Sequence, residues 1–329
     1  SELQLDGIVG GSRTLGVIDI NGTLDLNAAI TNATSIDVSS TSTLAANVTT
    51  SGTQTYNGAT TLETADRNLT ASTVNFGDTI TGTGSHDLTI TGALDLDGAM
   101  TQVVELTVTS TTDLGANVTT SGTHTYGDDV TLSDDITLTT TNNNVTFSGT
   151  VDSDAIGTKR DLTLTLGSGS ATFSGIVGST SLADITLNSS VTFAAAVTAD
   201  NLTIAASKTA TVKDDVTIAS NITLNNSSTL EVINTSAMTI SGTILENGGS
   251  ASSTLITVKF NTADTAPSKV TFSGTVTADS IKVGDAAAAT YAGYAHFTGS
   301  GGVTVGEARV TSGDHTNEYS TLQFDYAVT

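Results

Sequence analysis

Short runs of an apolar residue, a threonine and a second apolar residue recur along this chain, and they constrain its fold more than any other feature. Such runs occur at 130–132, 136–138, 162–164, 202–204, 216–218, 222–224 and 238–240. An alternation with period two places the aliphatic side chains on one face of a β-strand and the threonines on the other. Clusters of Asn, Asp, Gly and Ser separate the runs and favour turns. The sequence therefore predicts an almost wholly β protein with strands of roughly three to five residues.

Longer segments also repeat. The heptapeptide VTFSGTV occurs at 145–151 and 270–276, and variants of it occur at 74–80, 171–177 and 191–197. The decapeptide NVTTSGTQTY at 47–56 returns as NVTTSGTHTY at 117–126. Segment 88–96 likewise matches segment 18–26. Repeats of this kind are typical of stacked architectures, in which each unit buries its apolar face against the next.

These patterns predict an all-β fold, a β-solenoid of the parallel β-helix type. At roughly 20 residues per coil the chain would make about 15 coils, and a strand spacing of about 4.8 Å would give a rod of roughly 70 Å. The alternative is a string of tandem β-sandwich domains, which also contain regular short strands. Sandwiches usually carry Trp or Tyr anchors and prolines in their linkers, whereas this chain has no Trp and one Pro. The composition therefore favours the solenoid.

The repetitive solenoid is expected to span residues 1–285. Residues 286–329 differ from it, because four of the six tyrosines lie after residue 290, together with Phe297 and Phe324. We interpret 286–329 as a C-terminal cap or assembly segment.

The charge of the chain restricts its partners. With 33 acidic and 10 basic residues, its formal net charge is −23. Nucleic acids and anionic membrane surfaces are poor partners for such a polyanion. Purely apolar runs are only a few residues long, so no membrane span is expected. The chain has no cysteine, which excludes disulfides and thiolate metal sites and is compatible with an extracellular location.

Motifs for catalysis are absent. The sequence contains no histidine pair with metal-binding spacing, nucleophile elbow or P-loop. The four histidines (His86, His124, His296 and His315) are expected to face solvent or lie in turns. A polysaccharide-cleaving enzyme would need paired carboxylates and aromatic platforms for sugar rings, but no Tyr or Trp lies between residues 127 and 290. We therefore expect neither an enzyme nor a required cofactor.

Acidic pairs are the candidates for ion binding. Calcium takes six to eight oxygen ligands, which turns rich in Asp and Asn can supply. An alternative is that these pairs form solvated turns that keep the protein soluble. The candidate calcium ligands are Asp95, Asp97, Asp128, Asp129, Asp134, Asp135, Asp152, Asp154, Asp214 and Asp215.

The runs at 18–26 and 88–96 and the VTFSGTV units resemble those of bacterial surface proteins with β-strand repeats. That group includes filamentous haemagglutinin-like exoproteins and autotransporter passenger domains. The composition, rich in Thr, Ala, Gly and Asn, is also similar to that of surface-layer proteins, although their calcium-binding nonapeptides are missing. The resemblance covers most of residues 15–285. It implies a right-handed parallel β-helix displayed outside a bacterial cell, with a role in adhesion, biofilm or surface coating.

Two functional hypotheses follow. The first is a structural subunit of an extracellular bacterial assembly, a fibre, matrix filament or surface layer. Its copies would polymerise head to tail, because unpaired strand edges recruit further strands. The candidate interface residues are Leu3, Leu5, Leu322, Phe324, Tyr326 and Val328.

The alternative is an adhesin or passenger domain that binds glycans or other cells. Its candidate ligand cluster is Tyr291, Tyr294, His296 and Phe297. These rings could stack on sugars if they are exposed, but they would form the core of a cap if they are buried.

Overall fold

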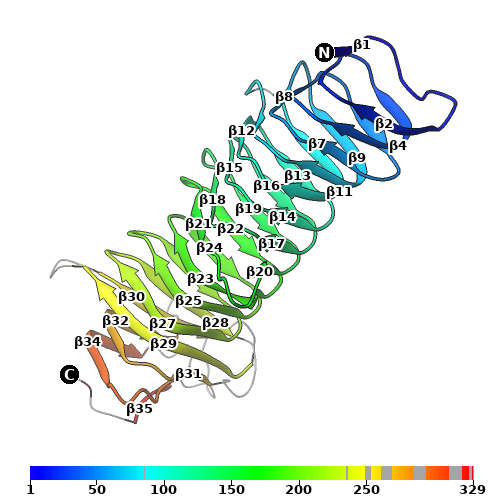
Figure 1. Cartoon of the computed structure of the whole chain (residues 1–329). Coiled ribbons are helices and arrows are strands. Elements are labelled where there is room, and N and C mark those ends of the chain that lie inside the picture. Colours follow the sequence, from blue (N-terminus) through cyan, green and yellow to red (C-terminus); the bar gives the residue numbers. More distant parts are fainter. Residues whose placement is uncertain are drawn as a thin grey trace. The chain divides into compact units, whose positions relative to one another are not determined.

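The computed structural model describes residues 1–84, 86–234, 236–248, 253–260, 269–284, 294–310, 321–325 and 328. In this part of the chain every regular element is a β-strand, and the strands stack in parallel as a β-solenoid of about 12 turns (Figure 1). The predicted all-β solenoid is thus confirmed, and the alternative of tandem β-sandwiches is wrong. No helix long and apolar enough to cross a membrane is found among the described residues.

The chain divides into two compact units. The first comprises Ser1–Asp154 and Thr165–Gly169, and the second comprises Ala155–Leu164 and Ser170–Thr329. The first unit contains β1 (Glu2–Leu5), β2 (Leu15–Ile20), β3 (Thr23–Leu26), β4 (Ile30–Val38), β5 (Ser42–Leu44), β6 (Val48–Thr50), β7 (Gln54–Tyr56), β8 (Thr60–Leu62), β9 (Arg67–Phe76), β10 (Ile80–Thr81), β11 (Leu88–Leu96), β12 (Met100–Val103), β13 (Leu106–Val108), β14 (Thr112–Leu114), β15 (Val118–Thr120), β16 (His124–Tyr126), β17 (Val130–Leu132), β18 (Ile136–Thr139), β19 (Val145–Phe147) and β20 (Val151–Ser153).

The remaining strands begin with β21, of which residues 162–164 belong to the second unit and Thr165 to the first. They are β21 (Leu162–Thr165), β22 (Ser170–Phe173), β23 (Val177–Leu187), β24 (Ser190–Phe193), β25 (Val197–Ile204), β26 (Thr209–Val212), β27 (Val216–Asn225), β28 (Thr229–Asn234), β29 (Met238–Asn247), β30 (Leu255–Phe260), β31 (Val270–Phe272), β32 (Val276–Val283), β33 (Tyr294–Phe297), β34 (Val303–Val310) and β35 (Thr321–Phe324).

Each turn of the first unit has three faces. The successive strands β12, β13 and β14 pair in parallel with β15, β16 and β17 of the next turn. Some strands exceed the predicted length because they run around a corner and contribute to two faces. Strand β9, for example, has 10 residues and pairs with both β6 and β7.

The turns differ in length, which explains why there are fewer of them than predicted. In the first unit, hydrogen-bonded side chains on adjacent turns lie 18 residues apart at Thr23 and Thr41. In the second unit, the corresponding separation is 25 residues for Thr254 and Asp279 and 29 residues for Tyr294 and Gln323. The prediction of about 15 coils assumed roughly 20 residues for every coil.

The core of each unit consists of columns of aliphatic side chains. Leu24 and Leu26 on β3 have no exposed surface, whereas Asp25 between them points outward. The parallel register keeps this alternation on the next turn, where Leu24 pairs with Ser42 and Leu26 with Leu44. Period-two alternation therefore fixes which side chains are buried, since a shift by one residue would turn each strand inside out.

Aromatic rings stack between neighbouring turns within the core. The ring centroids of Phe173 and Phe193 are 5.0 Å apart, and these residues occupy equivalent positions in β22 and β24. The two similar segments 171–177 and 191–197 thus lie one turn apart in the second unit. Such stacked pairs add about 0.5–1.5 kcal/mol each beyond the burial of their area.

The repeated decapeptides do not stack on each other. Gln54 pairs with Val74 on the next turn, and this column continues through Leu94, Thr112 and Val130. His124, the equivalent of Gln54, belongs to a different face, where it pairs with Leu106 and Val145. The decapeptide therefore specifies two short strands and the corner between them. This local structure occurs at different faces of the solenoid in its two copies.

Two histidines contradict the prediction that all four lie in solvent or turns. His124 on β16 has no exposed surface, and His296 on β33 is 7% exposed. Both occupy positions within strands. The prediction is wrong for these two residues, and His315 lies outside the described residues.

The described strands of 286–329 continue the parallel stacking. Strand β33 pairs with β31 and β35, and β34 pairs with β32. This segment thus adds further strands to the solenoid, and its role as a cap or assembly segment stays a prediction.

Candidate functional site

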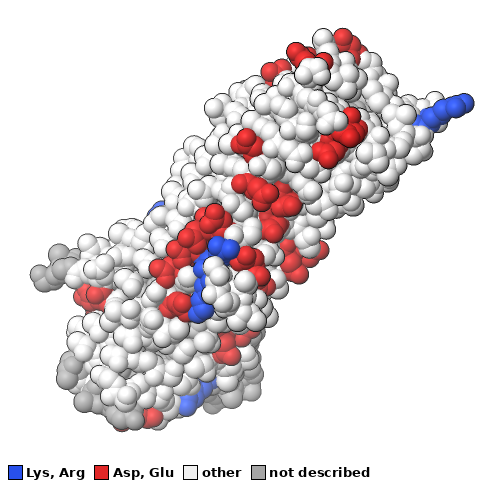
Figure 2. All heavy atoms as spheres, viewed as in Figure 1, with Lys and Arg blue, Asp and Glu red and all other residues white. Residues whose placement is uncertain are grey.

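An outward-facing column of acidic residues follows the third face of the first unit. We call it the acidic column, and it includes every residue that the register places at one outward position. In order of turns these residues are Asp19, Asp37, Thr55, Asn75, Asp95, Asp113, Thr131 and Asp152. Figure 2 shows acidic side chains recurring on the face in view. Carboxylates placed opposite each other on neighbouring strands repel, so the column carries a cost in stability.

Neighbouring carboxylates act on Asp95. Partial burial raises the pKa of the Asp95 carboxyl, and the nearby carboxylates of Asp97 and Asp113 raise it further. Asp113 is stabilised by the Ser133 hydroxyl, which donates a hydrogen bond of 2.5 Å to its Oδ1. The structure thus brings two predicted calcium ligands, Asp95 and Asp97, together with Asp113, which sequence reasoning missed. Asp113 becomes a neighbour only through the parallel register of β11 and β14.

Replacing Asp95 with asparagine is expected to stabilise the first unit at neutral pH by a few tenths to about 1 kcal/mol, because it removes one of three repelling carboxylates. The gain should shrink as the pH falls. A carboxyl with a raised folded-state pKa is destabilising while it is charged, and the penalty disappears once it binds a proton. Urea unfolding at several pH values and salt concentrations would measure this.

The matched control is Asp25→Asn, because the register neighbours of Asp25 are Gln4 and Thr43, which carry no charge. An equal gain in both variants, or a gain that persists at acid pH, would contradict the account of repulsion around Asp95.

Of the other predicted calcium ligands, Asp152 lies in β20 and belongs to the acidic column, and the rest are found in turns. Asp128, Asp134 and Asp214 each accept a hydrogen bond from the backbone N–H of the residue that follows. Asp129 and Asp215 accept one from a backbone N–H one turn later, at Thr150 and Thr239. Asp135, Asp152 and Asp154 also have interaction partners. The first five carboxylates act as structural acceptors, and calcium binding stays a prediction for the whole set. Within the described ranges, no three His, Cys, Asp or Glu side chains form a group that could hold a metal ion.

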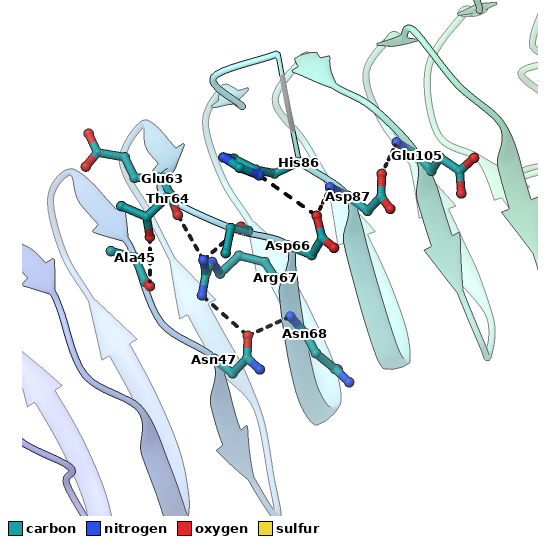
Figure 3. A network of polar contacts seen from close by, with 11 residues as sticks. Ala45, Asn47, Glu63, Thr64, Asp66, Arg67, Asn68, His86, Asp87 and Glu105 are labelled. Carbon is teal, nitrogen blue, oxygen red and sulfur yellow. Dashed lines mark hydrogen bonds and ion pairs between the residues drawn. The ribbon is translucent and has the colours of Figure 1, made fainter.

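One corner of the first unit shows how side-chain oxygens join successive turns (Figure 3). The Oδ1 of Asp66 accepts from the backbone N–H of Asp87, and the Oδ1 of Asp87 accepts from that of Glu105. Close to these two bonds, the Oδ1 of Asn47 accepts a hydrogen bond from the backbone N–H of Asn68, one turn later. Each bond satisfies a backbone donor at a corner, where the regular β ladder is interrupted.

Arg67 is the buried cation of this corner. Its guanidinium donates to the backbone oxygens of Glu63 and Ala65 at 2.9 and 2.8 Å. A longer bond of 3.4 Å joins it to Asn47 Oδ1. Burial lowers the pKa of Arg67, while the charge of Asp66 raises it. Arg67 thus holds the loop 63–66 against the solenoid and has a structural role here.

The N-terminal edge of the first unit is open among the described residues. Strand β1 pairs with β3 alone, and Leu3 and Leu5 extend the columns of Leu24 and Leu26. Leu3 is 40% exposed, whereas its column neighbour on β3, Leu24, has no exposed surface. The predicted interface residues Leu3 and Leu5 therefore belong to core columns, and β1 is the last described strand of these columns.

A similar edge is present in the second unit. Leu322 and Phe324 on β35 continue the columns of Ala295 and Phe297, and both are half-buried. Val328 bridges to Val303 and is 45% exposed. Tyr326, the remaining predicted interface residue, lies outside the described residues.

The predicted ligand cluster is mostly part of the core. The ring of Phe297 stacks between Phe272 and Phe324, at centroid distances of 4.6 and 5.2 Å. A ring covered on both faces offers no face to a sugar. His296 is buried with its Nε2 2.8 Å from Asp325 Oδ1, and a hydrogen bond from His296 lowers the pKa of that carboxyl.

The described member of this cluster that is partly accessible is Tyr294. Its hydroxyl donates to Gln323 Oε1 at 2.7 Å. Tyr291 lies outside the described residues.

Comparisons with protein families, with characterised proteins and with solved structures give no match to this chain.

Proposed function

We propose that the protein is a structural subunit of an extracellular bacterial assembly, without enzymatic activity, whose copies join end to end. The observation that supports this proposal is that no described strand covers the core columns at β1 or at Glu307–Val310. At these edges, Leu3, Val310 and Val328 are 40%, 45% and 45% exposed, although each continues a column of buried side chains. A strand edge with unpaired backbone groups and apolar side chains favours addition of a further strand.

The charge of the chain is compatible with this proposal. A net charge of −23 keeps copies apart in solution, so lateral aggregation is disfavoured. Association through a strand edge gains backbone hydrogen bonds and apolar contact, which offset this repulsion locally. Because the two edges differ, the contact is heterologous and generates an open chain of subunits.

Sedimentation velocity and negative-stain electron microscopy over a range of concentrations would test the proposal. We expect filaments or linear oligomers that lengthen as the protein concentration rises. The double variant Leu3→Lys/Leu5→Lys should shift the population to monomers, because it places two cations in the apolar columns at the edge.

The matched control is Ile156→Lys, since Ile156 is 90% exposed on a loop and lies in no strand. The control should assemble as the parent does. A parent that stays monomeric at all concentrations would overturn the proposal, as would a Leu3→Lys/Leu5→Lys variant that assembles unchanged.

A further inference from the structure

The order of the faces shows which part of each edge a neighbouring copy would meet. In the first unit the chain forms β1, then passes Val9, which bridges to Ile30, and then forms β2. The next strand, β3, returns to the face of β1. At this edge, the three faces of the turn are thus formed in chain order by β1, Val9 and β2.

The second unit has the same three-faced order at its other edge. After β33, strand β34 supplies two faces, because Val303–Val305 and Glu307–Val310 pair with separate halves of β32. Strand β35 then covers β33, and Val328 covers Val303. The third face, Glu307–Val310, therefore has one strand fewer than the other two among the described residues.

A solenoid continues by placing each new strand on the face that is one strand short. The position that follows Val328 in this order lies on Glu307–Val310. Among the described strands, a neighbouring copy that docks without a gap places β1 there, so that its next two faces then meet β35 and Val328. Any other rotation about the stacking direction leaves one face without a strand between the copies, with unpaired backbone groups.

The two strand segments match in length and pattern. Glu307–Val310 and β1 each have four residues, and each alternates outward and inward side chains. In the second unit, Ala308 and Val310 continue the buried columns of Ile281 and Val283. In the first unit, Leu3 and Leu5 occupy the corresponding inward positions. Parallel pairing of the segments would close both columns.

One outward charge, that of Arg309, favours the same pairing. Lys282 and Arg309 are neighbours in one outward column of the second unit, and both are cationic. At the other edge, Gln4 is followed in its column by Asp25, and Gln4 Nε2 donates to Asp6 Oδ1 at 3.1 Å. Pairing of Arg309 with Gln4 puts Arg309 diagonal to Glu2 and Asp6, about 7–8 Å away and within reach of a long side chain.

We propose that β1 of one copy pairs in parallel with Glu307–Val310 of the next, with Leu3 opposite Ala308, Gln4 opposite Arg309 and Leu5 opposite Val310. This inference rests on the proposed end-to-end assembly and specifies its joint. Two of the candidate interface residues, Leu322 and Phe324, are not part of this strand pair, because they lie on another face of the turn.

The absence of cysteine from the chain makes a crosslinking test direct. In the double variant Gln4→Cys/Arg309→Cys, the two thiols would lie on neighbouring parallel strands, about 4.8 Å apart. A short bis-maleimide should then convert the oligomers into covalent dimers and longer chains, which denaturing electrophoresis would resolve. The matched control is Gln4→Cys/Gln323→Cys, because Gln323 is an exposed outward residue of β35. This control should crosslink poorly.

The outcomes separate the joint from the assembly. Crosslinking in the Arg309 variant alone supports the proposed pairing. Crosslinking in the Gln323 variant alone, or equally in both variants, overturns the pairing while end-to-end assembly stands. Sedimentation of the same variants before crosslinking shows whether they assemble. If neither assembles and the parent does not assemble either, the proposed function itself fails, and the joint with it.

A charge substitution gives a second, independent measurement. Glu2 would lie opposite Glu307 in this pairing, which is unfavourable. The variant Glu2→Lys should therefore assemble at lower concentration than the parent. The double variant Glu2→Lys/Glu307→Lys should lose this gain. An unchanged assembly concentration in Glu2→Lys would overturn the register.

Discussion

Alanine in place of Gly92 is expected to destabilise the first unit by about 3–5 kcal/mol, since it combines backbone strain with a steric clash. Gly92 has φ +136, a region that residues with a side chain rarely adopt. It lies where the register between β9 and β11 shifts, and an added Cβ would be 2.0 Å from the backbone oxygen of Ala71. Because that neighbour is backbone, one turn must move away from the other. Thermal unfolding followed by circular dichroism would measure the loss.

Gly16→Ala is the matched control. Gly16 also lies in a strand of the first unit, but no atom is within 4 Å of its added Cβ and its φ is not positive. Its unfolding free energy should change by no more than about 0.5 kcal/mol. Equal stability of the two variants would show that the close contact between turns at Gly92 does not require glycine at this position.

A second large effect is expected when the pH is lowered, and it depends on His124. Burial lowers the pKa of His124 to about 4. The unfolded chain binds a proton at this residue near pH 6.5, so acid favours the unfolded state between that pH and the folded-state pKa. The contribution of a neutral His124 is thus complete above about pH 6.5, and about 3 kcal/mol should be lost on acidification to about pH 4.

The hydrogen bonds around His124 explain why a proton is not accommodated. The Thr120 hydroxyl donates to the Gly122 oxygen at 2.9 Å, so the His124 Nε2, 2.8 Å away, must be the donor to Thr120 Oγ1. The Nδ1 of His124 is then a bare acceptor with no hydrogen-bond partner. Its strand neighbours Leu106 and Val145 are apolar. Tyr126, the titratable residue against the ring, is itself buried with its pKa raised.

The first decapeptide supplies the matched experiment. There, Gln54 donates to the Thr70 oxygen at 2.9 Å and accepts from the Tyr56 hydroxyl at 3.3 Å. In the second copy, the Tyr126 hydroxyl has no partner. His124→Gln should therefore add about 1 kcal/mol at neutral pH by satisfying that hydroxyl. It should also abolish most of the loss between about pH 6.5 and 4.

The reverse substitution, Gln54→His, should introduce acid sensitivity at the other copy. Chemical unfolding of the parent and both variants at a series of pH values would measure these differences. If the three stability curves run parallel with pH, the account of His124 is wrong.

Much of the fold could be predicted because burial follows a local pattern. The alternation of Val130, Thr131 and Leu132 needs no knowledge of neighbouring strands to show that one face is apolar. The turn residues between such runs indicate where each strand ends. The predicted number of coils was too high because the sequence does not show how many residues each corner takes up.

The candidate site was predicted only in part. Asp95 and Asp97 are close in sequence, but Asp113 joins them through an 18-residue turn that the sequence does not mark. His124 was expected in solvent, although one local signal was available. His124 lies two residues before Tyr126, so both side chains point to the same face of the strand, and Tyr126 is expected to be buried. The first copy of the decapeptide has Gln54 at this position.

The sequence by itself determined that the chain consists of short β-strands with apolar side chains on the inward face and threonines and carboxylates on the outward face, because side-chain direction along a strand depends on residue parity alone. The tertiary structure decided which residues share a column. Tyr56 and Tyr126 belong to nearly identical decapeptides, yet they lie in different columns. Tyr56 stacks on Phe76, and Tyr126 stacks on Phe147. The physical reason is that corner lengths set the register between turns, and that register depends on contacts between residues about 18–21 positions apart.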